Sequence, residues 1–277
     1  MKKKLKTLLV SLGIKTLIFK TILRFQMIWN QIFNKTVRSQ NADYKSIPIV
    51  IISFNQLLYL KQLVDFLTLN KYSNIIIVDN NSTYEPLLDY FDEISAAVTI
   101  HRLKENTGHM VFWENETLFT TYAQGYYVVT DADVVPETAC PHDFLLSFKQ
   151  ILNSNLEVTK VGFSLKIDDI PNENSIKDKI IKWESQFWEN KDEKGNYKAK
   201  IDTTFALYRP GYKPKRIDFF NGIRTPYPLI AKHGGWYVDQ GNLSAEQLYY
   251  YNSCNSSSSW KTNTAGNLEN NNYNSSS

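Results

Sequence analysis

The stretch Tyr126-Tyr-Val-Val-Thr-Asp-Ala-Asp-Val-Val-Pro136 joins a predicted strand to two closely spaced acids. Strand-favouring residues run directly into Asp131 and Asp133, and Pro136 stops the strand from continuing. Ligands of α/β proteins bind just beyond the carboxyl ends of the strands, where both aspartates would lie. Two carboxylates there are costly without a cation between them, and Mg²⁺ or Mn²⁺ prefers carboxylate and phosphate oxygens. The pattern indicates a metal site for a diphosphate, and a turn that caps the next helix is the alternative.

Three more apolar runs precede this stretch and alternate with segments of helical spacing. Buried parallel strands are almost continuous in apolar residues, as these runs are. The predicted strands are Ile47–Ser53, Asn74–Asp79 and Ala97–His101, and the predicted helices cover residues 57–67, 86–91 and 109–124. This alternation is typical of parallel strands joined by right-handed crossovers. The sequence therefore predicts an α/β fold with a doubly wound, mostly parallel sheet and a Rossmann-like nucleotide-binding half.

Polar residues follow these strands at the edge where such folds bind nucleotides. Asp79 ends one strand, in a position that suits a ribose or a base, and a helix cap is the alternative. The Asn106-Thr-Gly108 loop precedes a predicted helix, where a glycine lets backbone N–H groups approach a phosphate. Taken alone, a loop of this kind is usually only a turn.

The composition excludes some classes of protein. Of 277 residues, 43% are hydrophobic, which is enough for one packed domain. Two cysteines, Cys140 and Cys254, supply neither a disulfide framework nor a zinc site. Residues 1–45 hold ten Lys or Arg and one acid, a charge of +9, so the other residues carry −6. Because the positive charge belongs to one end, we expect no nucleic-acid partner.

The basic N-terminal segment, residues 1–45, is interrupted by Lys15, Lys20 and Arg24, so it does not suit a membrane-spanning helix. Apolar residues recur on one helical face, at Ile18, Ile22, Phe25, Trp29 and Ile32. A basic amphipathic helix of this kind is typical of segments that lie on anionic membrane surfaces. A helix packed on the protein's own core is the alternative. We predict a cytoplasmic protein, peripheral on the inner face of the cell membrane.

Four motifs occur in a fixed order along the first half of the chain. They are Ile47-Pro-Ile-Val-Ile-Ile-Ser-Phe-Asn55, Ile75-Ile-Ile-Val-Asp-Asn-Asn-Ser-Thr83, Asn106-Thr-Gly108 and Val128-Val-Thr-Asp-Ala-Asp133. Together they resemble the GT-A fold glycosyltransferases, particularly the family 2-like bacterial enzymes, closely over residues 46–140 and loosely over 141–250. The resemblance implies sugar transfer from a nucleoside-diphosphate-sugar donor, usually with Mn²⁺ or Mg²⁺. It also implies that the donor contacts are Ser53, Asn55, Asp79, Asn106, Gly108 and Asp131, with Asp133 on the metal.

The acceptor side falls in the second half, with predicted helices at 141–153 and from about 176 and a predicted strand at 159–166. Asp202, at the mouth of a further predicted strand, is the favoured general base, because a carboxylate can take the proton of an attacking hydroxyl. Glu184 and the pair Asp168 and Asp169 are the alternatives. Inverting members of the family commonly show a Glu-Asp pair at a helix start, which this sequence lacks. Asp202 would otherwise bind acceptor hydroxyls or cap a turn.

The segment Ala231-Lys-His-Gly-Gly-Trp-Tyr237 supplies the last candidates. In many enzymes of the resembled fold, a histidine near the C-terminal end completes the metal site. His233 is therefore predicted to bind the metal together with Asp133 and Asp131, and a structural histidine is the alternative. Lys232, or Arg224 upstream, would neutralise the leaving nucleoside diphosphate.

These observations predict three parts: the basic segment 1–45, a GT-A domain at 46–251 and a disordered Asn/Ser-rich tail at 252–277. The predicted activity is metal-dependent, inverting transfer of a sugar to a glycan acceptor, free or lipid-linked, of a surface polysaccharide or lipopolysaccharide. A nucleotidyltransferase is one alternative, although the residues after the first strand, 53–56, form no Gly-rich basic loop. A non-catalytic carbohydrate-binding protein that kept the fold is the other.

Overall fold

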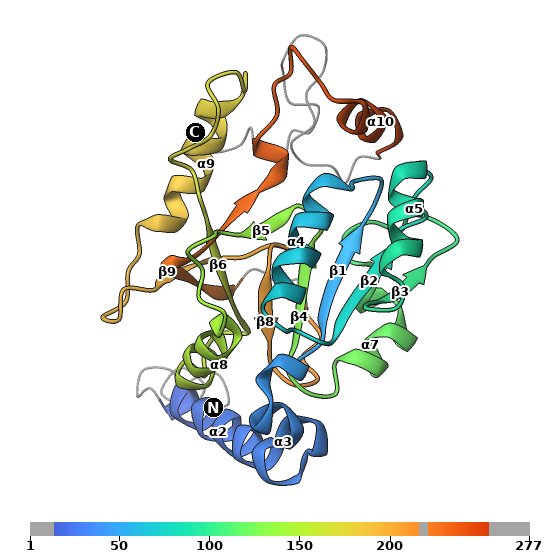
Figure 1. Cartoon of the computed structure of the whole chain (residues 1–277). Coiled ribbons are helices and arrows are strands. Elements are labelled where there is room, and N and C mark those ends of the chain that lie inside the picture. The colour runs from blue at the N-terminus through green and yellow to red at the C-terminus, as the bar shows by residue number, and fades with distance from the viewer. Residues whose placement is uncertain (1–13, 216–220, 255–277) are drawn as a thin grey trace, which may run out of the picture.

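The computed structural model describes residues 14–215 and 221–254, and a mixed β-sheet forms its centre (Figure 1). The strands are β1 Ile49–Ser53, β2 Ile75–Asp79, β3 Thr99–Arg102, β4 Tyr127–Asp131, β5 Val134–Pro136, β6 Lys160–Leu165, β7 Tyr197–Lys200, β8 Ala206–Tyr208 and β9 Asn221–His233. Their order is β3-β2-β1-β4-β8-β6-β9-β5, and β7 pairs with β9 outside this path. The predicted α/β fold is confirmed.

The first half of the sheet, β1 to β4, is wholly parallel and is called the parallel half. Ile49 to Ser53 lie beside Ile75 to Asp79 in register, so Ser53 and Asp79 end their strands side by side. On the other flank of β1, Ile52 lies beside Asp131. The polar strand ends therefore share one edge of the sheet, as the sequence predicts for a Rossmann-like half.

The second half, β5 to β9, is called the mixed half because its strands pair in both directions. β8 runs antiparallel to both β4 and β6, and β9 runs parallel to β6 but antiparallel to β5 and β7. The 13-residue strand β9 links three neighbours, with a register shift opposite Phe163 and Ser164. Through these pairs, residues far apart in sequence reach the edge where β4 ends.

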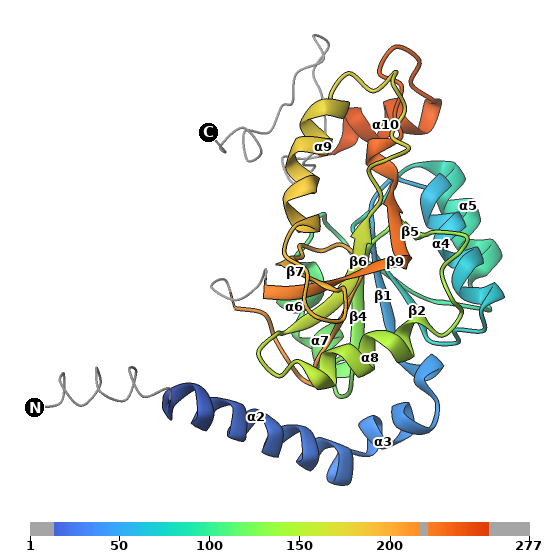
Figure 2. The same ribbon diagram turned by 90° about the vertical axis from the view of Figure 1, so that its left-hand side faces the viewer.

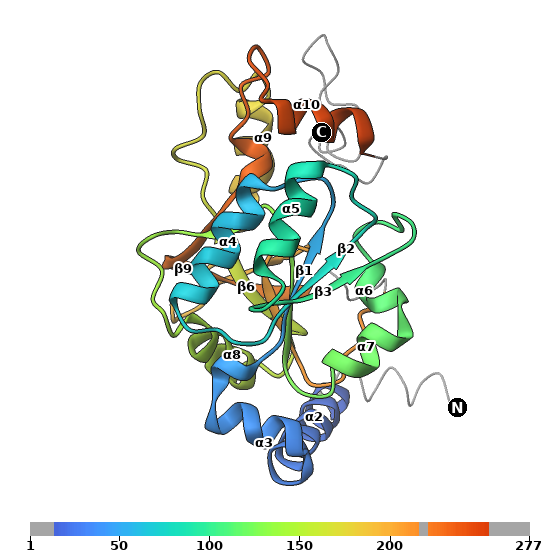
Figure 3. The same ribbon diagram turned by 45° about the vertical axis from the view of Figure 1, so that its right-hand side comes forward.

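Helices cover both faces of the sheet (Figures 1 and 3). They are α2 Ile14–Phe33, α3 Lys35–Ala42, α4 Leu58–Leu69, α5 Glu85–Ile94, α6 Val111–Glu114, α7 Glu116–Tyr122, α8 Phe144–Ser154, α9 Lys177–Ser185 and α10 Ala245–Ser253. Alternate strand residues point to opposite faces. One core cluster therefore joins α4, α5 and α8 to Ile49 and Ile51, and a second joins α6 and α7 to Val50 and Ile52.

The helix predicted over residues 109–124 is in fact two short helices, α6 and α7. Asn115 separates them, with backbone angles of φ −84° and ψ 102° that are extended and not helical. Its side chain accepts a hydrogen bond from the Leu118 N–H at 3.1 Å and so caps α7. A helix-capping residue such as Asn115 inside an apolar, helix-like pattern indicates a new helix start, which the apolar periodicity alone does not reveal.

The N-terminal segment divides into an extending helix and a docked one. In Figure 2, α2 projects from the body, and the other views also place it at the end opposite α10. By contrast, α3 is part of the body, since Val37 is buried and the Gln40 amide bonds both backbone groups of Tyr126 at 2.8 Å. The boundary predicted at residue 45 therefore differs from the structure, where the body begins near Asn34.

Two further predictions concern the ends of the chain. Helix α10 continues to Ser253, beyond the domain end predicted at 251. The predicted disorder of the tail falls almost entirely on residues 255–277, which lie outside the described residues. Within the described part of the chain, no helix is both long enough and apolar enough to cross a membrane.

Candidate active site

The two aspartates of the opening stretch lie where β4 gives way to β5. The N–H of Ala132, between them, still bonds the Ile52 carbonyl at 3.1 Å, so both acids are fixed to the end of the parallel half. Asp131 Oδ2 accepts a hydrogen bond from the Thr203 hydroxyl at 2.6 Å. Burial, and then repulsion by Asp133, raises the pKa of Asp131 to about 6. These neighbouring carboxylates favour a positive partner.

His233 meets Asp133 because β5 and β9 are paired, with Val134 opposite His233. The His233 Nδ1 atom lies 3.4 Å from Asp133 Oδ2, which also accepts the Gly235 N–H at 3.1 Å. The imidazole stacks on Trp236 with ring centres 4.9 Å apart and an angle of 10° between the planes. The structure therefore brings His233 and Asp133 together, and their shared binding of a metal stays a prediction.

The donor set can be tested for its fit to a divalent cation. Among the described residues, no three His, Cys, Asp or Glu side chains stand together in a metal-binding arrangement. However, Mg²⁺-type sites commonly use one or two carboxylates and take their remaining oxygens from substrate phosphates and water. Asp133, with Asp131 close by, supplies such carboxylates. The buried His233 Nδ1 atom has no hydrogen-bond partner among the described residues. The residues therefore fit a cation that shares its ligands with a diphosphate.

Gly234 allows the His233 segment to lie against the body. A Cβ atom at this position would come within 2.2 Å of the Tyr59 ring on α4, so no other residue fits without movement. The Gly234 N–H also bonds the Asp133 carbonyl at 2.7 Å. The contact fixes the segment after β9 beside the Asp133 carboxylate.

On the parallel half, Asp79 ends β2 and is fully buried. Its carboxylate accepts the Ser82 N–H and hydroxyl, and Arg102 Nε lies 3.2 Å from its Oδ2. Asn55, which adopts φ +49°, accepts the Thr83 N–H at 2.8 Å through its side chain. Asp79 and Asn55 thus build one rigid corner, in which the exposed Arg102 offers a cation to a ligand.

The loop at residues 106–108 reaches the same corner. The Asn106 side chain accepts the Gly108 N–H at 3.0 Å, and Gly108 adopts φ +89°, which L residues rarely take. Asn80 donates to the Gly108 carbonyl at 3.1 Å. In the described structure the Ser53 hydroxyl and Asn80 Oδ1 are buried without a hydrogen-bond partner. These two atoms leave hydrogen-bonding capacity unused at this corner, and a donor contact at Ser53 stays a prediction.

Helix α10 adds contacts to this corner that the sequence analysis did not predict. The Glu246 carboxylate accepts the Leu57 N–H at 2.9 Å, and the Ser253 hydroxyl accepts from the Asn55 amide at 2.9 Å. The signal that could have found the helix is a capping box, in which the Ser244 and Gln247 side chains bond each other's backbone N–H groups.

Asp202 lies in the loop between β7 and β8 and not inside a strand. Its side chain is partly exposed and close enough to Asp131 to raise the pKa of that carboxyl. Its backbone carbonyl accepts a hydrogen bond from Lys160 Nζ at 3.0 Å. The favoured base therefore shares the aspartate-rich edge with Asp131 and Asp133.

Glu184 and Lys232 are placed differently from Asp202. Glu184 is 2% exposed and forms a buried ion pair with Arg224, which leaves it poorly placed to meet a substrate hydroxyl. Lys232 Nζ lies 3.1 Å from Asp169 and 3.4 Å from Glu137. Side chains of neighbouring residues on a strand point to opposite faces. The Lys232 side chain therefore contacts Asp169 and Glu137, whereas the His233 side chain contacts Asp133. Burial raises the pKa of Glu184, and Arg224 and, less strongly, the nearby His233 imidazole oppose this rise. Glu184 therefore lies near His233, but Arg224 occupies its carboxylate, and Lys232 is held by its two acidic partners.

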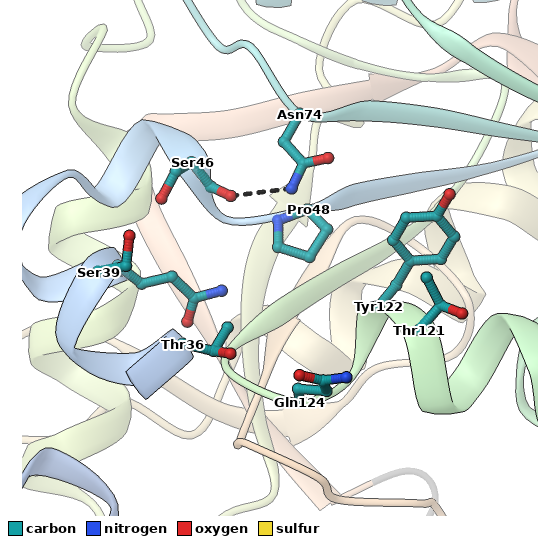
Figure 4. A pocket seen from close by; sticks show the side chains of 9 residues that line it. Thr36, Ser39, Ser46, Pro48, Asn74, Thr121, Tyr122 and Gln124 are labelled. Carbon is teal, nitrogen blue, oxygen red and sulfur yellow. Dashed lines mark hydrogen bonds between the residues drawn. The ribbon is translucent and has the colours of Figure 1, made fainter. Parts of the chain in front are cut away.

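A separate pocket of about 250 Å³ lies near the amino ends of β1 and β2 (Figure 4). Most of its polar groups already bond protein atoms. The Asn74 amide donates to the Ser46 carbonyl at 3.0 Å, and the Tyr122 hydroxyl bonds His101 at 2.7 Å. The pocket is remote from the carboxylates, and we do not assign it to the candidate site.

Fold and site together define an α/β protein with a Rossmann-like parallel half and with carboxylates and a histidine at the carboxyl edge of its sheet. No family model matches the sequence, and no curated protein matches it. Among solved structures, the mannosyltransferase PcManGT from Pyrobaculum calidifontis, in complex with GDP-Man and Mn²⁺, is similar at 11% identity and a TM-score of 0.44, over 84% of this chain and 71% of that one. S. aureus TarS 1-349 is similar at 10% identity and a TM-score of 0.42, over 77% and 69%. A cytidylyltransferase from Leptospira borgpetersenii is similar at 11% identity and a TM-score of 0.32, over 45% and 56%. These are distant similarities of fold.

Proposed function

We propose that this protein transfers a sugar from a nucleoside-diphosphate-sugar donor to a glycan acceptor of a surface polysaccharide or lipopolysaccharide. The observation that carries the proposal is the meeting of Asp131, Asp133, His233 and Asp202 at the edge where the parallel half ends. A carboxylate pair suits a metal-bound diphosphate, and a third carboxylate close by suits proton removal from an acceptor.

The donor would occupy the corner formed by the ends of β1 and β2. There the buried Ser53 hydroxyl and Asn80 amide oxygen have no hydrogen-bond partner among the described residues, and Arg102 presents positive charge. Asp133 and His233, with Asp131, would hold Mn²⁺ or Mg²⁺. When bound, that cation supplies positive charge that stabilises the diphosphate as it leaves.

Asp202 would act on the acceptor. Its carboxylate accepts the proton of the attacking hydroxyl as the hydroxyl oxygen forms a bond to the anomeric carbon of the donor sugar. The bond from that carbon to the diphosphate oxygen breaks, and the electron pair leaves with the nucleoside diphosphate. Attack opposite the leaving group inverts the anomeric configuration. A product that keeps the donor configuration would rule out this single displacement.

Thermal unfolding with a panel of nucleoside diphosphates and nucleotide sugars, each with and without Mn²⁺, tests the donor site. At 100 times its dissociation constant, one ligand adds about 2.7 kcal/mol to stability. We expect one nucleotide to stabilise the wild type only with metal, and the Asp133→Ala variant to lose this response. Glu137→Ala is the matched control, since Glu137 bonds Lys232 and not the metal candidates.

The reaction products separate the proposed activity from its alternatives. A sugar transferase releases nucleoside diphosphate in the presence of an acceptor, and a nucleotidyltransferase releases pyrophosphate from a nucleoside triphosphate. A carbohydrate-binding protein binds glycan and releases neither. Failure of every nucleotide to shift the unfolding temperature of the wild type would refute the transferase proposal.

We also propose that α2 attaches the protein to the cytoplasmic face of an anionic membrane, where a lipid-linked acceptor would be available. Seven of its large apolar side chains are between 47% and 67% exposed: Ile18, Ile22, Phe25, Ile28, Trp29, Ile32 and Phe33. The charge of +9 on residues 1–45 complements anionic lipid. A helix that carries aromatic residues on an exposed apolar face gains free energy when that face enters the lipid interface.

Sedimentation with lipid vesicles tests this attachment. We expect binding to phosphatidylglycerol-containing vesicles, little binding to phosphatidylcholine alone, and a loss of binding when Phe25 and Trp29 are both changed to Ser. Leu69→Ser is the control, because Leu69 is 82% exposed on α4 in the body. Equal binding of the double variant and the wild type would exclude α2 as the membrane contact.

A further inference from the structure

The loop of residues 201–205 connects β7 to β8 and contacts both sides of the candidate site. On one side, the Thr203 hydroxyl donates to Asp131 Oδ2 at 2.6 Å. On the other, Lys160 Nζ on β6 donates to the Asp202 carbonyl at 3.0 Å. A single short segment therefore lies between the acid at the end of β4 and the acid proposed as base.

The side chains of this loop are largely buried in the core. Ile201 is fully buried, and Thr203 is 5% exposed. Lys160 is also fully buried, and its amine donates a second hydrogen bond to the Tyr208 hydroxyl on β8 at 3.0 Å. Burial lowers the pKa of the Lys160 amine to about 7, so this position is costly for a lysine in its charged form.

The hydrogen bonds fix directions as well as positions. Because the Thr203 hydroxyl donates to Asp131 Oδ2, this hydrogen bond restrains the rotation of that carboxylate. Because Lys160 holds the Asp202 carbonyl, the backbone from which the Asp202 side chain projects is also set. The separation between the two carboxylates depends on one loop.

We propose that Thr203 and Lys160 are positioning residues, with Thr203 orienting the donor-side Asp131 and Lys160 orienting the acceptor-side Asp202. The inference rests on the proposed function, since that function gives these two carboxylates their roles. A substrate site must hold reacting groups to within a fraction of an ångström, and a lost orienting bond reduces the rate even when the fold survives.

Thr203→Val and Thr203→Ser form the matched pair that tests this inference. Val keeps the shape and loses the hydroxyl, and Ser keeps the hydroxyl. We expect kcat/KM for the donor to fall about tenfold to hundredfold in Thr203→Val, the range expected for one hydrogen bond to a charged group. The Mn²⁺ concentration for half-maximal activity should rise in the same variant, and Thr203→Ser should stay within about threefold of the wild type.

A change of stability alone would not give this result. If Thr203→Val lowers the unfolding temperature but leaves kcat/KM and the Mn²⁺ dependence unchanged, the role of Thr203 is only structural and the inference is overturned. Lys160→Met is the second variant, for which we expect a lower kcat with little change in the donor KM. An unchanged kcat in a folded Lys160→Met protein overturns the role of Lys160.

Amide hydrogen exchange over residues 201–205 separates this inference from the proposed function. We expect faster exchange there in Thr203→Val than in Thr203→Ser, whether or not a donor has been found. A wild type that transfers no sugar from any donor would refute the proposed function, while unchanged exchange in Thr203→Val overturns the inference by itself.

Discussion

The parallel half and the mixed half of the sheet hold their polar residues in different ways. In the parallel half, Ser53, Asp79 and Asp131 come directly at strand ends, and the register of three neighbouring strands brings them to one edge. In the mixed half, Asp202 and His233 are held by side chains that lie far away in the sequence, namely Lys160 and Asp133. Strand register places the first set, and long-range side-chain contacts place the second. His233 is proposed to bind the metal and Asp202 to act on the acceptor, so we expect substitutions at Asp133 and at Asp202 to separate donor binding from turnover.

The largest expected effect is on turnover, at Asp202. General base catalysis contributes about 10²–10⁴-fold to a rate, so Asp202→Asn should lower kcat by roughly 10³-fold. The variant should keep the metal-dependent nucleotide stabilisation, because Asp202 is not among the proposed donor contacts. Asp133→Asn should lose both the transfer activity and the metal-dependent stabilisation by nucleotide. If Asp202→Asn also abolishes the thermal response to nucleotide, Asp202 takes part in donor binding and its role is not confined to turnover.

The second effect concerns the buried pair of Glu184 and Arg224, whose side chains are 2% and 4% exposed. Removing one partner leaves the other charge buried without compensation, at a cost of about 3–5 kcal/mol. We expect Arg224→Met to show this loss in urea unfolding, and Arg224→Met with Glu184→Leu to recover much of it. Strong activity loss without any stability loss in Glu184→Gln would instead favour Glu184 as the base.

The third effect is a pH dependence that belongs to the mixed half. The folded-state pKa of Lys160, about 7, lies below its ordinary value of 10.5, so between these values the unfolded chain binds more protons. Stability should therefore rise with pH, by about 2 kcal/mol between pH 7 and 9. Lys160→Met should lack this rise. The difference between the two proteins, measured by urea unfolding at each pH, removes the contribution of titratable groups that do not interact with Lys160.

The smallest effect tests the contact that joins the two halves. An alanine Cβ at residue 234 would overlap the Tyr59 ring, and overpacking of this kind typically costs 1–3 kcal/mol. We expect Gly234→Ala to lower the free energy of unfolding by that amount. The change should be less than additive with Tyr59→Ala, as for residues in contact. Full additivity would show that the ring moves aside without cost.

The sequence predicted the parallel half well because the information there is local. Apolar runs such as Ile75–Val78 identify a buried strand, and the acid that follows marks its end. The division between α6 and α7 was not predicted, because the apolar pattern continues across Asn115 while its capping side chain stops the helix. The periodic spacing of apolar residues indicates which face of an element is buried, but it does not indicate where a side chain forms a hydrogen bond with the backbone.

The candidate site was predictable only in part for the same reason. Asp131, Asp133 and His233 were predicted and lie together, and Asp202 lies beside them. The role of Thr203 could not be predicted, since its partner Asp131 lies 72 residues away and only the pairing of β8 with β4 brings the two together. Glu184 seemed available in the sequence because Arg224, its buried partner, is 40 residues further along.

The placement of α2 has a consequence for the size of the acceptor. This helix lies at the amino ends of the strands, whereas the carboxylates lie at the carboxyl ends (Figures 1 and 2). Strands of five residues alone separate these ends by about 17 Å. With α2 on a lipid surface, the reacting hydroxyl must stand well above the headgroups. If α2 attaches the protein as proposed, a lipid-linked acceptor would need a glycan long enough to carry its reacting hydroxyl across this distance.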